Sequence, residues 1–337
     1  MRICAYSRPD AKGEYLRFLK QYGIEDVVLT VNDHPDAERR FARENADKPG
    51  AQWEFLDLMQ ARKRCEDAGL RAVAIENPVP TWCYERIVLG LPGRDQQIEN
   101  LQTTIRNMGR AGIPILGYHW MVNHSTAIRN AWRTSETTSG RGGARVSSFD
   151  LELARHSPLF RDREFSDEEM WANYEYFVRA IVPVAEEAGV RLAIHPDDPP
   201  VEKLGGIPRL FHDFEGHRRA MEMADSTSSG LNLCLGNWTA MGTDILAAIR
   251  HFGQRGQLVY GHLQGVQGKV PRFSECFVDE ADCDFASVLR TLKEVGFDSV
   301  LLPGHCPLTL FEDERGNQGF LYAVGYARAL IEAVSDD

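Results

Sequence analysis

The sequence lacks an excess of positive charge, long apolar runs and a cysteine framework. It contains 38 Lys and Arg residues and 49 Asp and Glu residues, which gives a formal net charge of −11. This acidic balance argues against nucleic acids and anionic membrane surfaces as partners. No stretch reaches the roughly 18 consecutive apolar residues of a membrane-spanning helix, so we expect no membrane partner.

Other absences bear on compartment and fold. The first residues, MRICAYSRPD, contain no apolar signal-peptide core, and we expect them to begin a folded strand. The seven cysteines are an odd number without framework spacing, which fits a reducing, cytoplasmic location. No glycine-rich nucleotide loop follows the first strand, so a dinucleotide-binding fold has little support.

Short apolar runs predict eight strands. The runs are continuous and do not alternate with polar residues, which is typical of strands covered on both faces. The predicted strands are residues 2–6, 26–31, 71–76, 113–118, 191–195, 230–235, 257–262 and 298–303. Helical patterns lie between them, and in one of these His212 and His217 are interpreted as solvated. The alternation predicts a single (β/α)₈ barrel domain over residues 1–337, with a doubly wound open sheet as the alternative.

One connection is too long for an ordinary barrel loop. Residues 119–165 separate the fourth predicted strand from its helix, and their central part is rich in Ser, Thr, Gly and Arg. Long loops in compact domains are often lids over a functional site, so we interpret this insertion as lid-like. A plain flexible insertion explains the composition equally well.

Side chains that bind metals collect at the predicted strand ends. A barrel carries its chemistry at the C-terminal ends of its strands. These ends hold Tyr6, Asn32, Glu76, Tyr118 with His119, His195, Cys234, His262 and His305. Imidazole and thiolate bind divalent ions such as Zn²⁺, Fe²⁺ or Mn²⁺, so the last four predict one metal site. Taken singly, each is also explained as a packed core residue.

The predicted strand that ends at His195 stops abruptly in the sequence HPDDPP. Its three prolines cannot continue a β-ladder, so the chain must leave the barrel mouth there. Asp197 and Asp198 are then expected at the mouth, where they hold His195 by a hydrogen bond or bind substrate hydroxyls. Glu76 and His119 are also expected to bind substrate. Solvated turn residues are the alternative for the two aspartates.

Several stretches resemble the D-mannonate dehydratase family. They are AIHPDDPP, GIPRL, GLNLCLG and GHLQGV, with LGLPGRDQQIENLQTTIRNMGRAGI upstream and FSECFVDEADCDFASVLRTL downstream. The resemblance covers residues 70–330. It implies a barrel of the xylose-isomerase-like type that uses a divalent metal, usually Mn²⁺, with Fe²⁺, Mg²⁺ or Zn²⁺ as alternatives. The implied reaction removes water from D-mannonate, a small sugar acid, to give 2-keto-3-deoxy-D-gluconate. Because family members often associate, the resemblance is also compatible with a homo-oligomer.

The resemblance assigns roles to single residues. His195, Cys234 and His262 match three of the family's metal ligands. His305 matches its catalytic histidine, and Tyr322 takes the place of its catalytic tyrosine, shifted by one position. The resemblance therefore implies that His305 and Tyr322 form the acid–base pair of the dehydration.

Three positions depart from the family pattern. The fourth metal ligand, an aspartate on the last strand, is replaced by Gly304, and an arginine on that strand is replaced by Leu302. Gln264 stands where the family has another arginine. Loss of an arginine removes a strong charge-assisted contact to a substrate carboxylate, so the substrate remains open.

Two other functions remain open at this point. A metal-dependent sugar isomerase or epimerase shares the enediolate step, and Glu76 is its candidate base. The lost charges at Gly304 and Leu302 also fit a barrel that binds a sugar-like ligand without catalysis. Metal-dependent exchange of a substrate C–H with solvent distinguishes an enzyme from a binding protein.

Overall fold

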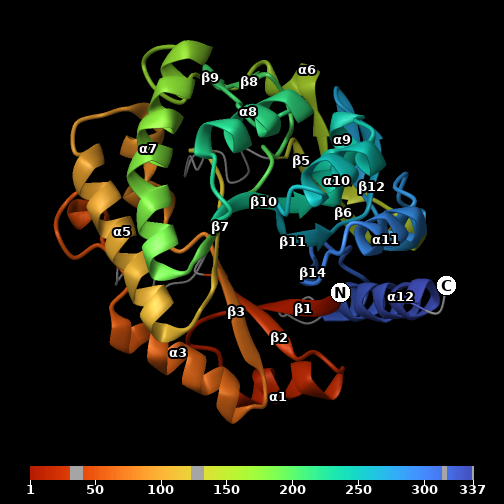
Figure 1. Ribbon diagram of the computed structural model, residues 1–337. Coiled ribbons are helices and arrows are strands. Elements are labelled where there is room, and N and C mark those ends of the chain that lie inside the picture. The colour runs from red at the N-terminus through yellow and green to blue at the C-terminus, as the bar shows by residue number, and fades with distance from the viewer. Residues whose placement is uncertain (31–40, 123–132, 313–316, 336–337) are drawn as a thin grey trace.

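The computed structural model describes residues 1–30, 41–122, 133–312 and 317–335. Eight parallel strands close into a barrel surrounded by helices (Figure 1). The barrel strands are β1 (Arg2–Ser7), β2 (Asp26–Thr30), β3 (Arg71–Glu76), β4 (Ile115–Tyr118), β7 (Arg191–Ile194), β10 (Ser229–Cys234), β11 (Leu258–Leu263) and β14 (Val300–Pro303). β1 pairs with both β2 and β14, so the sheet closes and the open-sheet alternative is wrong. The predicted barrel is confirmed.

Helices cover the outside of the barrel. They are α1 (Gly13–Gln21), α3 (Phe55–Asp67), α4 (Glu85–Leu89), α5 (Arg94–Ala111), α6 (Leu151–Ala154), α7 (Asp167–Ala188), α8 (Phe214–Ala224), α9 (Leu235–Met241), α10 (Ile245–Gly253), α11 (Phe285–Glu294) and α12 (Asn317–Ser335). Short 3₁₀ turns lie at η1 (Arg43–Asn45), η2 (Thr81–Cys83), η3 (Arg141–Gly143) and η4 (Val278–Glu280). α3, α5 and α7 lie side by side on one flank (Figure 1). None of the described helices has both the length and the apolarity that a membrane span requires.

The longest helix, α7, begins and ends at residues that suit its termini. The Ser166 side chain accepts from the Glu169 backbone N–H, and the Glu169 side chain accepts from the Ser166 backbone N–H. This reciprocal pair satisfies two donors that a helix start otherwise leaves free. Gly189, with φ of 65°, ends the helix in a left-handed conformation that glycine adopts without strain. The next residues enter β7, which leads to the functional rim.

Apolar side chains form two separate layers. The inner layer lies inside the barrel and consists of Cys4, Val28, Ala74, Ala193, Val259, Tyr260, Val300 and Leu302. The outer layer lies between the strands and the helices. Strand residues point alternately to the two layers, which explains why the sequence shows continuous apolar runs. Because side chains fill the barrel, the rim of strand ends is the natural place for a site.

Two strands of the described part of the insertion belong to a regular sheet. Four antiparallel strands pair in the order β12-β13-β6-β5. They are β12 (Val266–Lys269), β13 (Arg272–Glu275), β6 (Arg145–Asp150) and β5 (Ser135–Ser139), while β8 (Lys203–Leu204) and β9 (Ile207–Pro208) form a separate hairpin. Phe149 of β6 packs on Phe273 of β13 at 5.5 Å between ring centroids. The insertion therefore pairs through β6 with β13, a strand that follows β11, and its described residues include regular strands. Residues 123–132 of the predicted lid lie outside the described residues.

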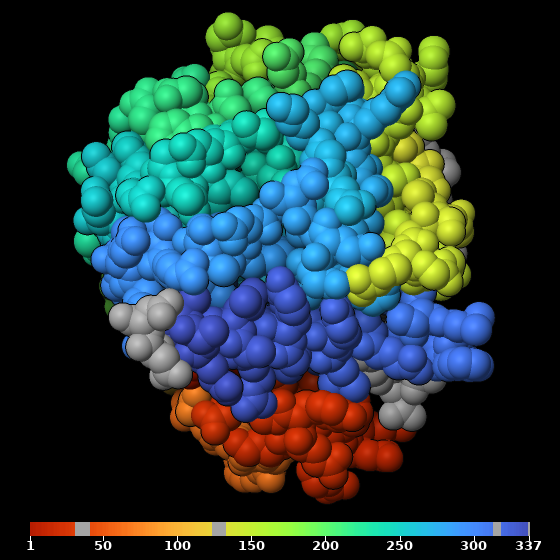
Figure 2. Space-filling model, turned by 90° about the vertical axis from the view of Figure 1, so that its right-hand side faces the viewer, coloured from red at the N-terminus to blue at the C-terminus, as the bar shows by residue number. Residues whose placement is uncertain are grey.

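The C-terminal helix packs against both the first and the last strand of the barrel. α12 packs against β1 and β14, the first and last barrel strands. Figure 2 shows this helix in dark blue, between the N-terminal segments in red and the preceding part of the chain in lighter blue. The packing places α12 across the seam where the barrel closes.

Candidate metal centre

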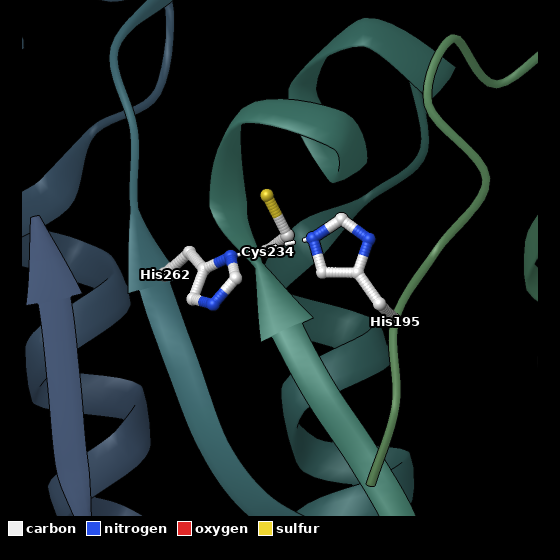
Figure 3. A group of neighbouring side chains, drawn as sticks. All are labelled: His195, Cys234 and His262. Carbon is white, nitrogen blue, oxygen red and sulfur yellow. Dashed lines mark hydrogen bonds between the residues drawn. The ribbon is translucent and has the colours of Figure 1, made fainter. Parts of the chain in front are cut away.

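Three metal-binding side chains meet at the C-terminal rim of the barrel (Figure 3). His195 directly follows β7, Cys234 ends β10 and His262 lies in β11. Parallel strands bring their C-terminal ends to one rim, and Cys234 stands opposite His262 in the register of β10 and β11. One ligand atom from each residue lies within 4.8 Å of the other two. The three predicted ligands therefore converge on one point.

The hydrogen bonds of the two histidines direct one ring nitrogen of each toward the same point. Nδ1 of His195 lies 2.7 Å from the carbonyl oxygen of Pro196, so Nδ1 is the donor and Nε2 keeps its lone pair. Nε2 of His262 lies 2.9 Å from a Glu76 carboxylate oxygen, which likewise leaves the His262 Nδ1 lone pair free. These two free nitrogens are 3.3 Å apart. This is the arrangement of histidines that ligate a metal while a carbonyl or carboxylate orients each ring.

Cys234 is prepared to bind as a thiolate. Burial raises the pKa of its thiol, but His195 and His262 outweigh burial and lower the pKa to about 5. Nδ2 of Asn237 donates to the sulfur over 3.3 Å, whereas the protonated thiol donates to Oε1 of Gln264 over 3.1 Å. Thiolate with imidazole is a donor set for borderline divalent ions such as Zn²⁺ and Fe²⁺. The residues present therefore fit a divalent metal.

Glu76 supports His262 from inside the barrel. Its Oε2 accepts from Nε2 of His262 at 2.9 Å and from the hydroxyl of Tyr260 at 2.6 Å. Its Oε1 accepts from the hydroxyl of Tyr6 at 2.8 Å. Burial raises the pKa of Glu76, but His262 outweighs it and holds the pKa at about 2. Both oxygens accept hydrogen bonds inside the barrel, and the expected substrate contact of Glu76 and its role as an isomerase base stay predictions.

Asp197 stabilises the loop that follows β7. It is 1% exposed, and its carboxylate accepts from the backbone N–H of Phe211 at 2.7 Å and from Nη1 of Arg209 at 3.3 Å. Burial raises the pKa of this carboxyl even though Arg209 and the backbone bond oppose the rise. The Nδ1 atom of His195 is held by the carbonyl of Pro196 rather than by Asp197, which corrects that expectation, and the expected substrate contact of Asp197 stays a prediction.

His119 belongs to the wall beside the rim. Its Nε2 lies 3.1 Å from the hydroxyl of Tyr84, and its Nδ1 accepts from the backbone N–H of Met121 at 3.2 Å. It is 7% exposed and borders a cavity of about 40 Å³ lined mainly by apolar side chains, among them Trp120 and Phe177. Its predicted substrate contact stays a prediction.

His305 contacts a cluster of buried charges that the sequence did not predict. Its Nδ1 lies 2.6 Å from Oε1 of Glu275, and Nη2 of Arg133 lies 2.7 Å from the same oxygen. Arg133 also forms a two-pronged ion pair with Asp198, and Gln264 donates to Glu275 over 3.1 Å. Asp198, which was expected to contact substrate or His195, is instead paired with an arginine.

Tyr322 lies on α12 at the surface and is 43% exposed. Its ring packs edge-on against Phe277 at 5.6 Å between centroids, and the Arg141 guanidinium lies 5.8 Å from its ring centre. No recorded contact among the described residues joins Tyr322 to His305. The catalytic role of Tyr322 stays a prediction.

The structure shows what surrounds Leu302 and Gly304, two of the positions expected to depart from the family pattern. Leu302 is fully buried and belongs to the inner apolar layer of the barrel. A Cβ placed on Gly304 would meet only Cδ2 of Leu302, at an ordinary 3.6 Å. Gly304 therefore has room for a side chain. Asn32, the second predicted strand end, lies outside the described residues.

Sequence reasoning missed Arg133 and Glu275. Glu275 stands in the stretch FSECFVDEADCDF, whose resemblance to a family marked the segment but not the residue. Arg133 precedes β5 in the insertion, where no periodic pattern or strand end gives a signal. Both reach His305 through pairing of β6 with β13, a contact between segments more than a hundred residues apart.

Comparison with known proteins identifies close similarities along most of the chain. Residues 11–158 and 152–336 match the protein family described as D-mannonate dehydratase. Mannonate dehydratase of Streptococcus pneumoniae (strain 70585) is 31% identical over 305 residues, which cover 84% of this chain and 79% of that protein.

Solved structures give the same result for the whole chain. The crystal structure of mannonate dehydratase from Streptococcus suis serotype 2 has a TM-score of 0.81 and 27% identity, covering 100% of this chain and 94% of that one. A xylose isomerase domain protein from Planctomyces limnophilus has a TM-score of 0.60 at 14% identity, covering 99% and 98%. The second likeness concerns the fold alone, and it confirms the xylose-isomerase-like type of barrel.

Proposed function

The chain belongs to the D-mannonate dehydratase family, and from this membership we propose that it removes water from a sugar acid with a divalent metal. D-Mannonate is the expected substrate, and a 2-keto-3-deoxy acid is the product. The observation that carries the proposal is the convergence of His195 Nε2, Cys234 Sγ and His262 Nδ1 on one point of the barrel rim. The proposed ion is Mn²⁺, with Fe²⁺, Mg²⁺ or Zn²⁺ as alternatives.

The reaction needs a base at one carbon and an acid at the neighbouring carbon. The base removes the proton from the carbon that bears the carboxylate. The acid protonates the hydroxyl that leaves the next carbon as water, and the resulting enol becomes a keto group. A bound divalent metal would withdraw electron density from the carboxylate and so make that proton more acidic. His305 is the proposed acid–base residue, and Tyr322 is its proposed partner.

His305 is suited to proton transfer by its position at the rim. Its side chain is 40% exposed, and Nδ1 is held by Glu275. Among the described residues Nε2 has no hydrogen-bond partner, so this nitrogen can meet a substrate. A histidine that presents one nitrogen to the substrate and has the other fixed is the usual form of a general base.

Among the residues that the structure describes, the metal centre has three candidate protein ligands, one fewer than the family resemblance implies. His195, Cys234 and His262 supply three, and Gly304 supplies none. Three protein ligands with an open position are typical of catalytic metal sites, where water or substrate completes the shell. His195, Cys234 and His262 would hold the metal, which would polarise the carboxylate of a bound sugar acid.

The direct test is a panel of hexonic acids, including D-mannonate and its C2 epimer D-gluconate, given to the Mn²⁺-loaded protein. Formation of a 2-keto-3-deoxy acid from D-mannonate, lost on His305→Asn, supports the proposal. Exchange of the C2 proton with solvent without loss of water would instead support an isomerase or epimerase. No exchange and no product from any acid in the panel would support a binding protein that has lost catalysis.

The proposal includes a cytoplasmic location for the protein and its association into a homo-oligomer. All seven cysteines are free thiols, which supports a reducing, cytoplasmic location. Self-association remains a prediction, since it rests on the behaviour of the family.

A further inference from the structure

We propose that Glu275 is the positioning residue of His305, and that Arg133 of the insertion keeps Glu275 ionised for this task. The inference rests on the proposed function, in which His305 transfers the proton. It assigns roles to two residues that neither the strand-end pattern nor the family resemblance singled out.

The geometry fixes the tautomer of His305. Glu275 Oε1 is 2.6 Å from Nδ1 of His305, and an ionised carboxylate can only accept a hydrogen bond. Nδ1 therefore carries the proton, and Nε2 of the neutral ring carries the lone pair. The side chain is 40% exposed, while the carboxylate of Glu275 is 7% exposed. A buried carboxylate thus orients an accessible imidazole.

The backbone supports the same orientation. His305 has φ of 51°, in the left-handed region that non-glycine residues rarely adopt. Such conformations persist where surrounding contacts hold them, and they concentrate at functional sites. The hydrogen bond to Glu275 is the contact that holds this side chain.

Glu275 is kept ionised by its surroundings. Nη2 of Arg133 contacts it at 2.7 Å and Nε2 of Gln264 at 3.1 Å. Burial raises the pKa of Glu275, but His305 and Arg133 outweigh burial and lower the pKa to about 2. The carboxylate is therefore charged throughout the pH range in which His305 titrates.

The charges around His305 are balanced only when its ring is protonated. The charged groups that face it are Glu275, Arg133 and Asp198. The two carboxylates and the one guanidinium have a net charge of −1, which a protonated His305 ring neutralises. Partial burial disfavours the imidazolium, but Glu275 outweighs it and raises the pKa of His305, while Arg133 acts in the opposite direction. Removing Glu275 and removing Arg133 should therefore shift the titration of His305 in opposite directions.

The insertion explains how the cluster is assembled. Glu275 ends β13, and Arg133 stands two residues before β5 in the same sheet. Nε of Arg133 also donates to Ser147 of β6 at 2.9 Å. The sheet thus fixes Arg133 above the barrel rim, within reach of both carboxylates. Supplying this cation is the role that we assign to the described part of the insertion.

The pairing is tested by following His305 in the Zn²⁺-loaded protein with ¹⁵N-labelled histidine, assigned with His305→Asn. Zn²⁺ is diamagnetic and permits the spectra. In Glu275→Gln, which keeps the shape and an acceptor oxygen, the His305 titration should move down by at least about one pH unit. In Arg133→Gln it should move up. Glu136→Gln, an exposed change on β5, is the matched control and should leave it unmoved.

The catalytic consequence is tested by the pH profile of kcat for D-mannonate with the Mn²⁺-loaded protein. Glu275→Gln should shift the limb that reports His305 in the same direction as the spectra and lower kcat about 100-fold, with a smaller change in KM. Unmoved His305 spectra in a folded Glu275→Gln protein would overturn the inference, as would an unshifted kcat profile. If Glu275→Gln fails to fold, an unmoved or downward titration in Arg133→Gln overturns it. Absence of turnover in the unmodified protein refutes the proposed function, and the spectra then decide the pairing separately.

Discussion

Glu76 shows at the scale of one residue how a buried carboxylate can determine metal binding. Its contact with Nε2 of His262 leaves Nδ1 to face His195. A neutral amide at this position would accept less strongly and would permit the ring to rotate. The orientation of a ligand ring is set by such a partner as much as by the ligand itself.

Replacing Glu76 therefore tests the support of the metal ligand. Glu76→Gln should weaken metal binding about 10- to 100-fold, the effect usual for partners of ligating histidines. The dissociation constant is measured by competition with a chromophoric chelator. Glu187→Gln, an exposed change on α7, is the control. Equal constants for Glu76→Gln and the unmodified protein would show that the carboxylate does not support the ligand.

Gly304 permits a second test at this scale. Its Cβ position is open except for an ordinary contact with Leu302, so a side chain fits there without strain. Gly304→Asp should supply a fourth ligand and tighten metal binding at least about tenfold, or ~1.4 kcal/mol. Gly304→Ala adds the Cβ without a carboxylate and should change nothing. An unchanged dissociation constant in Gly304→Asp would mean that this position does not face the metal.

At the scale of elements, helix α8 corrects one interpretation of the sequence. His217 was expected to be solvated, but it is 0% exposed and stacks on Trp238 at 4.8 Å between ring centroids. The prediction of a helix here is confirmed, but the prediction that His217 faces solvent is wrong. A polar side chain suggests an exposed position, and the sequence does not show which face of α8 packs against α9 and its Trp238. Nδ1 of His217 lies 2.6 Å from the carbonyl of Asp213, one turn earlier.

Burial of His217 predicts acid sensitivity of the fold. Burial lowers its pKa to about 4, below the value of about 6.5 in an unfolded chain. The unfolded state then binds more protons, so stability falls as the pH drops from about 6.5 to about 4, by on the order of 3 kcal/mol. His217→Phe should remove this slope from the free energy of unfolding, measured in urea at several pH values. His156→Gln, an exposed control, should retain it, and an equal slope in His217→Phe would contradict the assignment.

The elements that the sequence predicts are marked by local patterns, whereas the elements that it does not predict depend on contacts between residues far apart in the chain. Each barrel strand is a short apolar run, a local signal, and all eight appear where predicted. β5 and β6 read SETTS and RVSSFD, polar stretches whose partner β13 follows far along the chain. Pairing between distant segments leaves no periodic mark, so neither this sheet nor the Arg133–Glu275 contact was predictable. The ligands were predictable because a barrel collects its strand ends on one rim.

At the scale of the whole molecule, the barrel brings three candidate metal ligands to one part of its rim. His195, Cys234 and His262 stand on neighbouring strands β7, β10 and β11. The next strand, β14, carries Leu302 in the inner apolar layer and is followed by Gly304, and the family resemblance implies a charged residue at each of these positions. The family match extends over residues 11–158 and 152–336. The metal centre and His305 therefore carry the proposed chemistry without those two charges.

The metal content of the purified protein, measured by elemental mass spectrometry beside Cys234→Ala, tests the metal-dependent function most directly. Cys65→Ala, a change of another buried cysteine on α3, is the control. We predict about one equivalent of a divalent metal per chain in the unmodified protein and in the control, and its loss in Cys234→Ala. No bound metal after reconstitution with Mn²⁺, or equal metal in Cys234→Ala, would contradict the three-ligand centre and with it the proposed dehydratase.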